Sequence, residues 1–181
     1  CGYGNIQKLS SVEHDYLKNG YWAMNRREEL PCEGLTVTFL QYMTDITPAV
    51  EKARKKAEKE FKGKDNAEEL ILDYVQKELD EAIAKAEKAN PHCEARIETF
   101  YNENVYYIIV YKTYKDVRFV GAPPSSIGKF GGDTDNWMWP RHTGDFSMFR
   151  IYADKDNNPA AYSKDNVPYK PKKYFRVSTA G

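Results

Sequence analysis

One stretch of the chain, residues 131–145, concentrates the residue types that bind substrates. It contains two of the three tryptophans, one of the three histidines and three aspartates. Tryptophan and arginine make large, specific contacts, and carboxylates among aromatic rings can orient a positively charged group or a histidine. A loop so rich in these residues is rarely only a connection between elements. The stretch is therefore predicted to be a substrate-binding site.

Asp145 ends this stretch and immediately precedes an apolar segment, residues 146–150, that is typical of a strand. A carboxylate at the entrance of a strand can be half-buried with a fixed orientation. In a Ser-His-Asp triad the acid accepts a hydrogen bond from the histidine and stabilises the imidazolium without itself being protonated. Asp145 is the candidate for that role. The alternative is a turn or strand-entry cap formed by a Gly-Asp pair.

Two acidic segments resemble parts of a calcium loop but lack its spacing. Asp133, Asp135 and Asn136 are not followed by the glycine and the glutamate of an EF-hand, and Pro159 occupies the glycine position of the second segment. His142 lies next to Arg141, but no Gly-x-Ser-x-Gly motif accompanies it. We expect no metal and no cofactor, and the motifs identify no nucleophile within the chain.

Composition excludes several classes of protein. The 181 residues include 27 Lys and Arg against 27 Asp and Glu, a formal net charge of +0. Without an overall basic field, binding to nucleic acid is not expected. Hydrophobic residues make up 41% of the chain, enough for the core of one domain. No window approaches about eighteen consecutive apolar residues, so no membrane-spanning helix is predicted.

The three cysteines lie at positions 1, 32 and 93 without Cys-x-x-Cys spacing, which argues against a zinc ribbon or a thioredoxin-type site. Cys32 and Cys93 could form a disulfide and leave Cys1 to a partner upstream; three reduced thiols are the alternative. The absent initiator methionine and the opening Cys1-Gly2-Tyr3-Gly4 suggest a chain cut from a longer one.

Hydrophobic periodicity predicts a mixed α and β fold. One helix is expected to start at Thr47 as N-cap with Pro48 and to end at residue 61, and a longer amphipathic helix to run from Asn66 to Asn90. The two, at about residues 48–90, should form a hairpin packed on a sheet. Strands are predicted at residues 35–44, 94–100, 105–114, 117–120, 146–152 and 174–177, with a loop at 121–144.

The segment GGDTDNWMWPRHTGDFSMFR, residues 131–150, resembles the bacterial dipeptidyl-peptidase 7 and 11 family of serine exopeptidases. Residues 1–7 (CGYGNIQ), 29–31 (ELP) and 34–37 (GLTV) support the resemblance, which extends through nearly the whole chain. The family has a chymotrypsin-like double β-barrel and an added helical domain. The resemblance implies that residues 1–181 form part of the N-terminal barrel, with the helical hairpin inserted between its strands.

The resemblance also implies roles for individual residues. Asp145 matches the catalytic aspartate, and Asn136-Trp137 matches the pair that binds the free α-amino group of the substrate. An amide oxygen accepts hydrogen bonds from an ammonium, and an indole face adds cation–π attraction. Anchoring the ammonium would limit cleavage to the second peptide bond, so dipeptides are released. The catalytic histidine is expected just before Cys1 and the serine far beyond Gly181, so this segment alone is expected to be inactive.

The partner implied by the resemblance is an oligopeptide with a free N-terminus. A homodimeric parent protein and export to the periplasm or cell surface are implied as well. A preference for acidic or for hydrophobic side chains does not follow, because the deciding residue is expected near the missing serine. The alternative function is a non-catalytic module that binds a peptide or a sugar with the aromatic loop 131–145.

Overall fold

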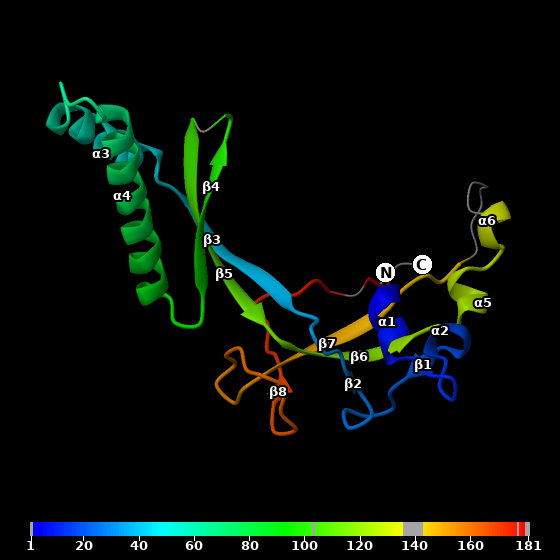
Figure 1. The fold of residues 1–181 in the computed structure, drawn as a ribbon. Helices are drawn as coiled ribbons and strands as arrows, with labels where there is room; N and C mark the ends of the chain where they lie inside the picture. The colour runs from blue at the N-terminus through cyan, green and yellow to red at the C-terminus, as the bar shows by residue number, and fades with distance from the viewer. Residues whose placement is uncertain (1, 103, 136–142, 177, 180–181) are drawn as a thin grey trace. The chain divides into compact units, whose positions relative to one another are not determined.

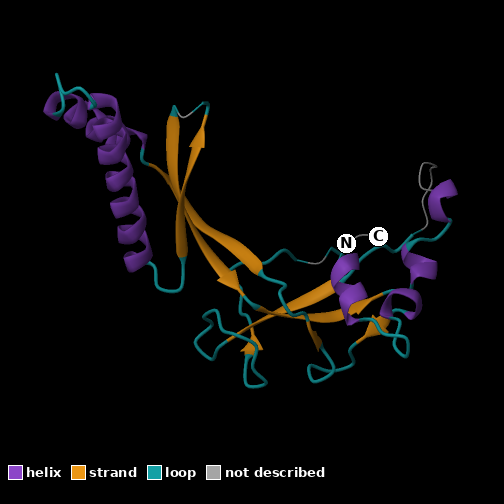
Figure 2. Cartoon of the chain, viewed as in Figure 1, coloured by secondary structure: helices purple, strands orange, loops and turns teal. Residues whose placement is uncertain are grey.

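The computed structural model describes residues 2–102, 104–135, 143–176 and 178–179 (Figure 1). Contacts divide the chain into two compact units, residues 1–37 with 114–181 and residues 38–113. Both units contain helices and strands (Figure 2), so the mixed α and β class predicted from the sequence is confirmed.

The unit at residues 38–113 combines a three-stranded sheet with two helices. Its elements in chain order are β3 (Val37–Asp45), α3 (Thr47–Glu60), α4 (Ala67–Ala89), β4 (Glu94–Phe100) and β5 (Val105–Tyr114). The sheet order is β3-β5-β4, and β4 pairs antiparallel with β5 in an unbroken register. The two predicted helices and the predicted strands 94–100 and 105–114 are all present.

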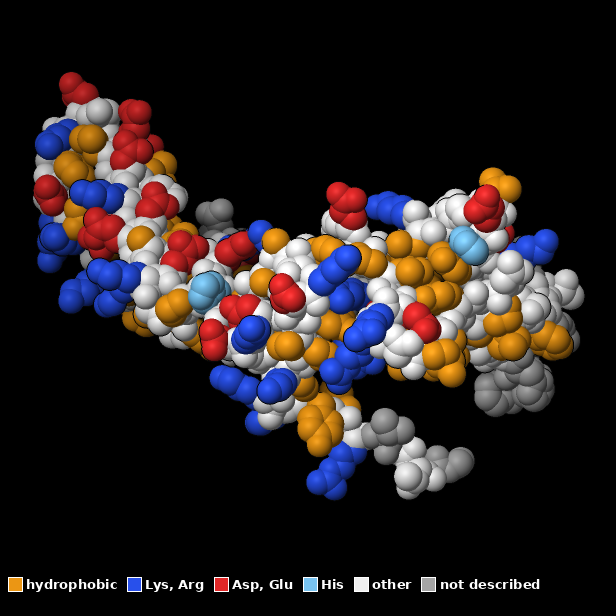
Figure 3. Space-filling model, turned by 90° about the horizontal axis from the view of Figure 1, so that it is seen from below, with side chains coloured by type: hydrophobic (Ala, Val, Ile, Leu, Met, Phe, Trp, Pro, Cys, Tyr) orange, Lys and Arg blue, Asp and Glu red, His pale blue; other side chains and the backbone are white. Residues whose placement is uncertain are grey.

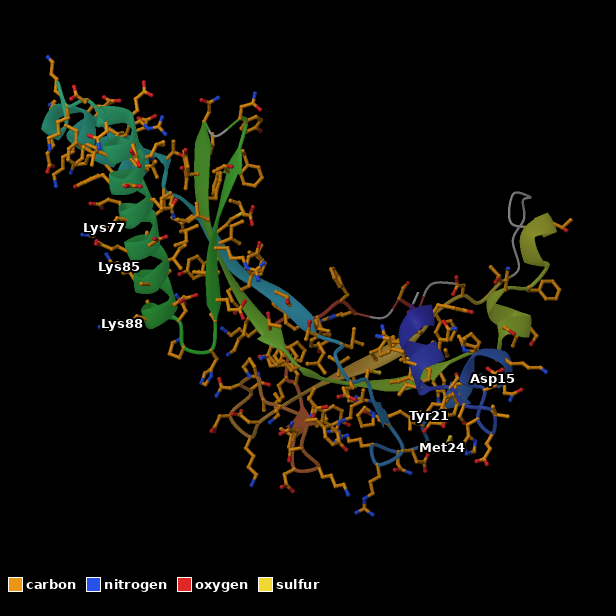
Figure 4. All side chains as sticks on the ribbon, viewed as in Figure 1. Asp15, Tyr21, Met24, Lys77, Lys85 and Lys88 are labelled. Atoms are coloured by element: carbon orange, nitrogen blue, oxygen red, sulfur yellow. The ribbon has the colours of Figure 1, made fainter. Side chains whose placement is uncertain are left out.

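Helices α3 and α4 contact each other, and α4 also contacts β4 (Figure 2). The core between helices and sheet consists of small and branched side chains together with one tyrosine, from α3, α4, β4 and β5: Val50, Ala53, Ala57, Val75, Ala95, Tyr106, Ile108 and Val110. On the outer side of α4, Lys77, Lys85 and Lys88 are exposed and point away from the sheet (Figure 4). The helix is therefore amphipathic, as its stripe of apolar residues predicts.

The start of α3 differs from the prediction by one residue. Ile46 rather than Thr47 is the N-cap. The Thr47 hydroxyl is instead used by β5, because it accepts a hydrogen bond of 2.9 Å from the Tyr106 backbone N–H. Asp45 accepts a hydrogen bond of 2.8 Å from the Thr47 N–H. The side chain that would cap the helix thus ties its first turn to the sheet.

The other unit, residues 1–37 and 114–181, contains a five-stranded sheet and short helices. Its strands are β1 (Tyr21–Trp22), β2 (Leu30–Pro31), β6 (Asp116–Ala122), β7 (Met148–Ala153) and β8 (Val167–Pro168). Its helices in the described ranges are α1 (Tyr3–Leu9), α2 (Tyr16–Asn19), α5 (Ser125–Gly128) and α6 (Gly132–Asp135). Strand β6 is central: it pairs antiparallel with β1, β2 and β7, and β8 pairs with the far edge of β7.

All seven residues of β6 are buried. Phe119 is 0% exposed and lies in a cluster with Ile6 of α1 and Cys32, against which the partly buried Tyr21 and Phe149 pack. At Gly121 an added Cβ would lie only 2.4 Å from the Trp22 ring, so a side chain cannot be accommodated there. Strand β6 therefore carries the core of this unit, a larger element than the predicted strand 117–120.

Two arginines face each other across the centre of the sheet. Arg118 of β6 is paired in register with Arg150 of β7. Like charges directly opposite each other are destabilising. Arg118 donates two hydrogen bonds, of 2.9 and 2.8 Å, to the buried Asp116 carboxylate, and a third of 2.8 Å to the Ser163 carbonyl. The hydrogen bond to Asp116 raises the pKa of Arg118.

Glu29 neutralises the second arginine. It is 6% exposed and accepts hydrogen bonds from Arg150 Nε at 2.8 Å and from the Tyr152 hydroxyl at 2.7 Å. Burial and the hydrogen bond to Glu29 raise the pKa of Tyr152 to about 12. Tyr152 therefore stays protonated near neutral pH and keeps donating to Glu29, while the Arg118 guanidinium lies 3.7 Å from the centroid of its ring.

Other predictions in this unit need correction. The expected loop at residues 121–144 contains α5 and α6, and the last strand is β8 at Val167–Pro168. The described residues 174–176 of the predicted strand 174–177 are not in a strand, and residue 177 lies outside the described part. The aromatic residues of that segment are instead exposed: Tyr174 is 78% and Phe175 is 101% exposed. A β-type residue pattern forms a strand only where a sheet edge is available to pair with it.

Replacing Asp116 with alanine should strongly destabilise the protein that contains this chain. The Arg118 charge would remain buried without its carboxylate partner, at a cost of about 3–5 kcal/mol in the free energy of unfolding. The matched control is Glu94→Ala, whose 3.5 Å ion pair with Arg96 joins side chains that are 61% and 65% exposed. That change should cost less than about 1 kcal/mol. Urea denaturation measures both, and equal losses would contradict the role of the buried pair.

Candidate functional site

The substrate-binding stretch predicted from the sequence is described only at its two ends. Its first residues form the short helix α6, Gly132–Asp135, and the chain is described again from Thr143. Asn136 and Trp137, the predicted amine-binding pair, lie outside the described residues, as does His142.

Helix α5 holds the segment that leads to Asp145. The Thr143 hydroxyl lies 2.9 Å from the carbonyl oxygens of both Ile127 and Gly128, to which it donates, and the Gly144 N–H donates to the Ile127 carbonyl at 3.2 Å. A Cβ on Gly144 would lie 3.2 Å from the Ile127 side chain, so glycine permits this close approach. These hydrogen bonds fix the position of the two residues that precede Asp145.

Asp145 lies three residues before the first residue of β7. The sequence suggested a half-buried carboxylate, but the side chain is exposed. The reason is local: the buried part of β7 begins only further along, with Tyr152 and Ala153, while Met148 at its start is exposed. An exposed carboxylate at a fixed strand entrance can accept a hydrogen bond from a group supplied by another segment.

The N-terminal segment lies against this same strand entrance. Gly2 adopts a positive φ of 74°, and a Cβ added to it would lie 2.6 Å from Ser147 Oγ and 2.9 Å from the Phe149 ring. Ile6 of α1 is 4% exposed in the cluster against which Phe149 packs. The start of the chain is thus within contact distance of a residue two positions after Asp145.

The residue pattern alone did not indicate this proximity, although the family resemblance implied it by placing the catalytic histidine just before Cys1 and Asp145 in the same triad. The signal available for it was the glycine at position 2, because glycine tolerates both a positive φ and a close approach of neighbouring atoms. Nothing in the residue pattern indicates which segment makes that approach, since Gly2 and Ser147 are far apart along the chain.

The sequence left open whether Cys32 and Cys93 form a disulfide or remain reduced. Both cysteines are free thiols. Cys32 is 6% exposed in the Phe119 cluster of one unit, and burial raises the pKa of its thiol. Cys93 packs beside Ala95 in the core of the other unit. The two side chains belong to different hydrophobic clusters, and Cys1 lies outside the described residues.

Within the described ranges, no three His, Cys, Asp or Glu side chains come together in a way that could hold a metal ion. Likewise, no helix among them is both long enough and apolar enough to span a bilayer.

Comparison with known proteins gives consistent matches over the whole chain. The family model Peptidase S46 matches residues 1–181. An Asp/Glu-specific dipeptidyl-peptidase of Porphyromonas gingivalis is 52% identical over 182 residues, which cover 100% of this chain and 25% of that protein. Dipeptidyl-peptidase 7 of the same organism is 50% identical over 181 residues, covering 100% of this chain and 24% of that protein.

Solved structures match as well. The crystal structure of Porphyromonas endodontalis DPP11 in complex with the dipeptide Arg-Glu is 49% identical with a TM-score of 0.77, and the match covers 100% of this chain and 26% of that one. The same enzyme in complex with substrate gives 48% identity, the same coverage and a TM-score of 0.78. The chain spans about a quarter of the length of the curated relatives it matches.

A Gly2→Ala substitution tests the packing of the N-terminal segment. Alanine must adopt a positive φ and place its Cβ against Ser147 and Phe149, so the free energy of unfolding should fall by about 1–3 kcal/mol. Gly4→Ala is the matched control, because a Cβ there meets nothing within 4 Å. Thermal and urea unfolding of the protein that contains this chain measure both variants. Equal stability of the two would show that the segment does not pack as described.

Proposed function

This chain belongs to the peptidase S46 family, and we propose that it is part of a serine dipeptidyl-peptidase that removes dipeptides from the free N-termini of oligopeptides. The observation that carries the proposal is the contact of Gly2 with the strand that Asp145 precedes. In the proposed enzyme the general-base histidine immediately precedes Cys1. A residue at that position would lie beside the Asp145 segment, where a triad requires it.

Asp145 would orient the histidine. Its carboxylate accepts the hydrogen bond from imidazole Nδ1–H, and its charge stabilises the imidazolium that forms when the histidine takes the proton of the serine hydroxyl. The exposure of Asp145 supports this assignment, because an imidazole from outside the 181 residues can reach it. The hydrogen bonds from Thr143 and Gly144 to α5 supply the rigid support that an orienting carboxylate needs.

Asn136 and Trp137 would select the substrate terminus. The amide oxygen of Asn136 accepts hydrogen bonds from the α-ammonium, and the Trp137 ring adds cation–π attraction. With the ammonium held at a fixed distance from the nucleophile, only the second peptide bond reaches it. Both relatives described above are named dipeptidyl-peptidases, which supports this product.

The surroundings of the site follow from the same proposal. The 181 residues would form part of the N-terminal barrel of a chymotrypsin-like peptidase domain, with α3 and α4 inserted between β3 and β4. Without the histidine and the serine, this segment alone would be inactive. We also propose a homodimeric parent protein exported to the periplasm or cell surface. Both rest on the family resemblance, and size-exclusion chromatography and fractionation of the parent protein test them.

Replacing Asp145 with asparagine should lower kcat by about 10⁴-fold, because asparagine would hold the histidine in the wrong tautomer. The measurement is release of dipeptides from chromogenic amides by the full-length protein, with acidic and hydrophobic residues at the second position. Asp156→Asn, a change of another exposed carboxylate, is the control and should leave kcat unchanged. Activity of the Asp145 variant within a few-fold of the parent would exclude a triad role and favour a non-catalytic binding module.

Replacing Asn136 with alanine should raise KM for substrates with a free amino group by about tenfold or more, because the ammonium loses a charge-assisted hydrogen bond. The N-acetylated form of each substrate should be a poor substrate for the parent and variant alike. Thr134→Ala, an exposed residue of α6, serves as the control. If the variant discriminated between free and acetylated substrates as strongly as the parent, Asn136 would not bind the amine.

A further inference from the structure

A groove of about 580 Å³ lies beside β8, in the unit that contains β7. This volume is within the range of about 300–1,000 Å³ found for ligand sites. The side chains that define its chemistry are three cations and a floor of aromatic and proline rings: Arg26, Lys155, Lys170, Pro168, Tyr169 and Tyr174. Figure 3 views the molecule from below and shows Lys and Arg side chains interspersed with hydrophobic and acidic ones.

No carboxylate of the described residues forms an ion pair with the cations that line the groove. Arg26, Lys155 and Lys170 are exposed, and none of them pairs with a carboxylate in the part of the chain that the structure describes. No Asp or Glu is among the described residues that line the groove. Three cations without an ion-pair partner around an apolar floor favour an anionic ligand, although the formal net charge of the whole chain is +0.

The groove is held by a rigid frame. The Asn157 side chain donates to the Lys170 carbonyl at 3.0 Å and accepts from the Lys170 N–H at 2.8 Å. Tyr114 donates to the Asn157 carbonyl at 3.0 Å, and its ring lies 4.7 Å from that of Tyr169. The Tyr169 N–H donates to the Ile151 carbonyl at 2.9 Å. A ligand would therefore bind without ordering these segments, which lowers the entropic cost of binding.

The groove is separate from the proposed catalytic centre. Tyr169 and β8 lie at the C-terminal end of β7, where Tyr152 pairs with Pro168, whereas Asp145 precedes its N-terminal end. The six residues of β7 span about 20 Å between them. A peptide positioned for cleavage at Asp145 would not have its scissile bond in the groove.

We propose that this groove is a binding site for an acidic peptide segment, distinct from the peptidase site. Arg26 binds one carboxylate in a bidentate manner, and Lys155 and Lys170 bind further carboxylates as point charges. The rings of Pro168, Tyr169 and Tyr174 contact the aliphatic parts of the peptide. This apolar floor favours a peptide over a bare phosphate chain, and the limited extent of the positive surface favours it over nucleic acid.

The test measures fluorescence anisotropy of a labelled, N-acetylated peptide of alternating Asp, Glu and Leu added to the full-length protein. Acetylation keeps the probe from being a substrate. The peptide should bind, its Asn/Gln counterpart should not, and affinity should fall with added salt. The triple variant Arg26→Gln, Lys155→Gln, Lys170→Gln should bind about tenfold or more weakly. The control triple variant Lys164→Gln, Lys172→Gln, Lys173→Gln, also of exposed lysines but outside the groove, should bind as the parent does.

Three results would overturn the proposal. Equal binding of the acidic and amide peptides would show that the charge of the peptide does not contribute to binding. Equal weakening by the two triple variants would show non-specific attraction to a basic surface. Groove-dependent binding of single-stranded DNA or of phosphatidylserine vesicles, with no binding of the peptide, would assign the groove to another class of ligand. Unchanged dipeptide release by both triple variants confirms that they are folded.

Discussion

The charge network between β6 and β7, in which Asp116, Arg118 and Glu29 are buried and the Arg150 side chain is 42% exposed, is the interaction on which the larger unit depends. Arg118 and Arg150 face each other in the register, and that register is tolerable only because Asp116 and Glu29 neutralise them. Removing charges from water is costly, so each buried group must be fully hydrogen-bonded. Among the described residues no buried side-chain nitrogen or oxygen lacks a partner. The network therefore specifies one register of β7 and disfavours its alternatives.

Because β7 is fixed in register, it can hold several other segments of the chain in defined positions. Its first residues contact the N-terminal segment and follow directly from Asp145, while its last residues pair with β8 beside the basic groove. Glu29 ties a third segment, the approach to β2, to the same strand through Arg150 and Tyr152. Segments that are far apart in the sequence are thus positioned by their contacts with one strand of six residues.

The unit at residues 38–113 is built differently. Its core is made by neighbouring elements: a helical hairpin and a β-hairpin, with Ile46, which follows β3, packed against them. Side-chain hydrogen bonds also join its helices to the sheet: the Thr47 hydroxyl accepts from the Tyr106 N–H, and Glu87 of α4 accepts from the Ala95 N–H of β4. Apolar contacts between adjacent elements need no buried charge, and the regular stripes of α4 and β5 are enough to specify them.

The sequence by itself determined the elements whose pattern repeats locally. These are α3, α4, β4 and β5, together with the motif that ends at Asp145 and the family to which it points. Periodicity carries that information because each face of a helix or strand must match its neighbours. The sequence could not show that Gly2 meets Ser147, that Glu29 neutralises Arg150, that Cys32 and Cys93 lie in separate cores, or that β8 lies at residues 167–168 rather than near 174. Those were decided by tertiary structure, because contacts between residues far apart in the chain depend on which sheet edges and cavities the folded units provide, and such contacts leave no periodic signal in the sequence.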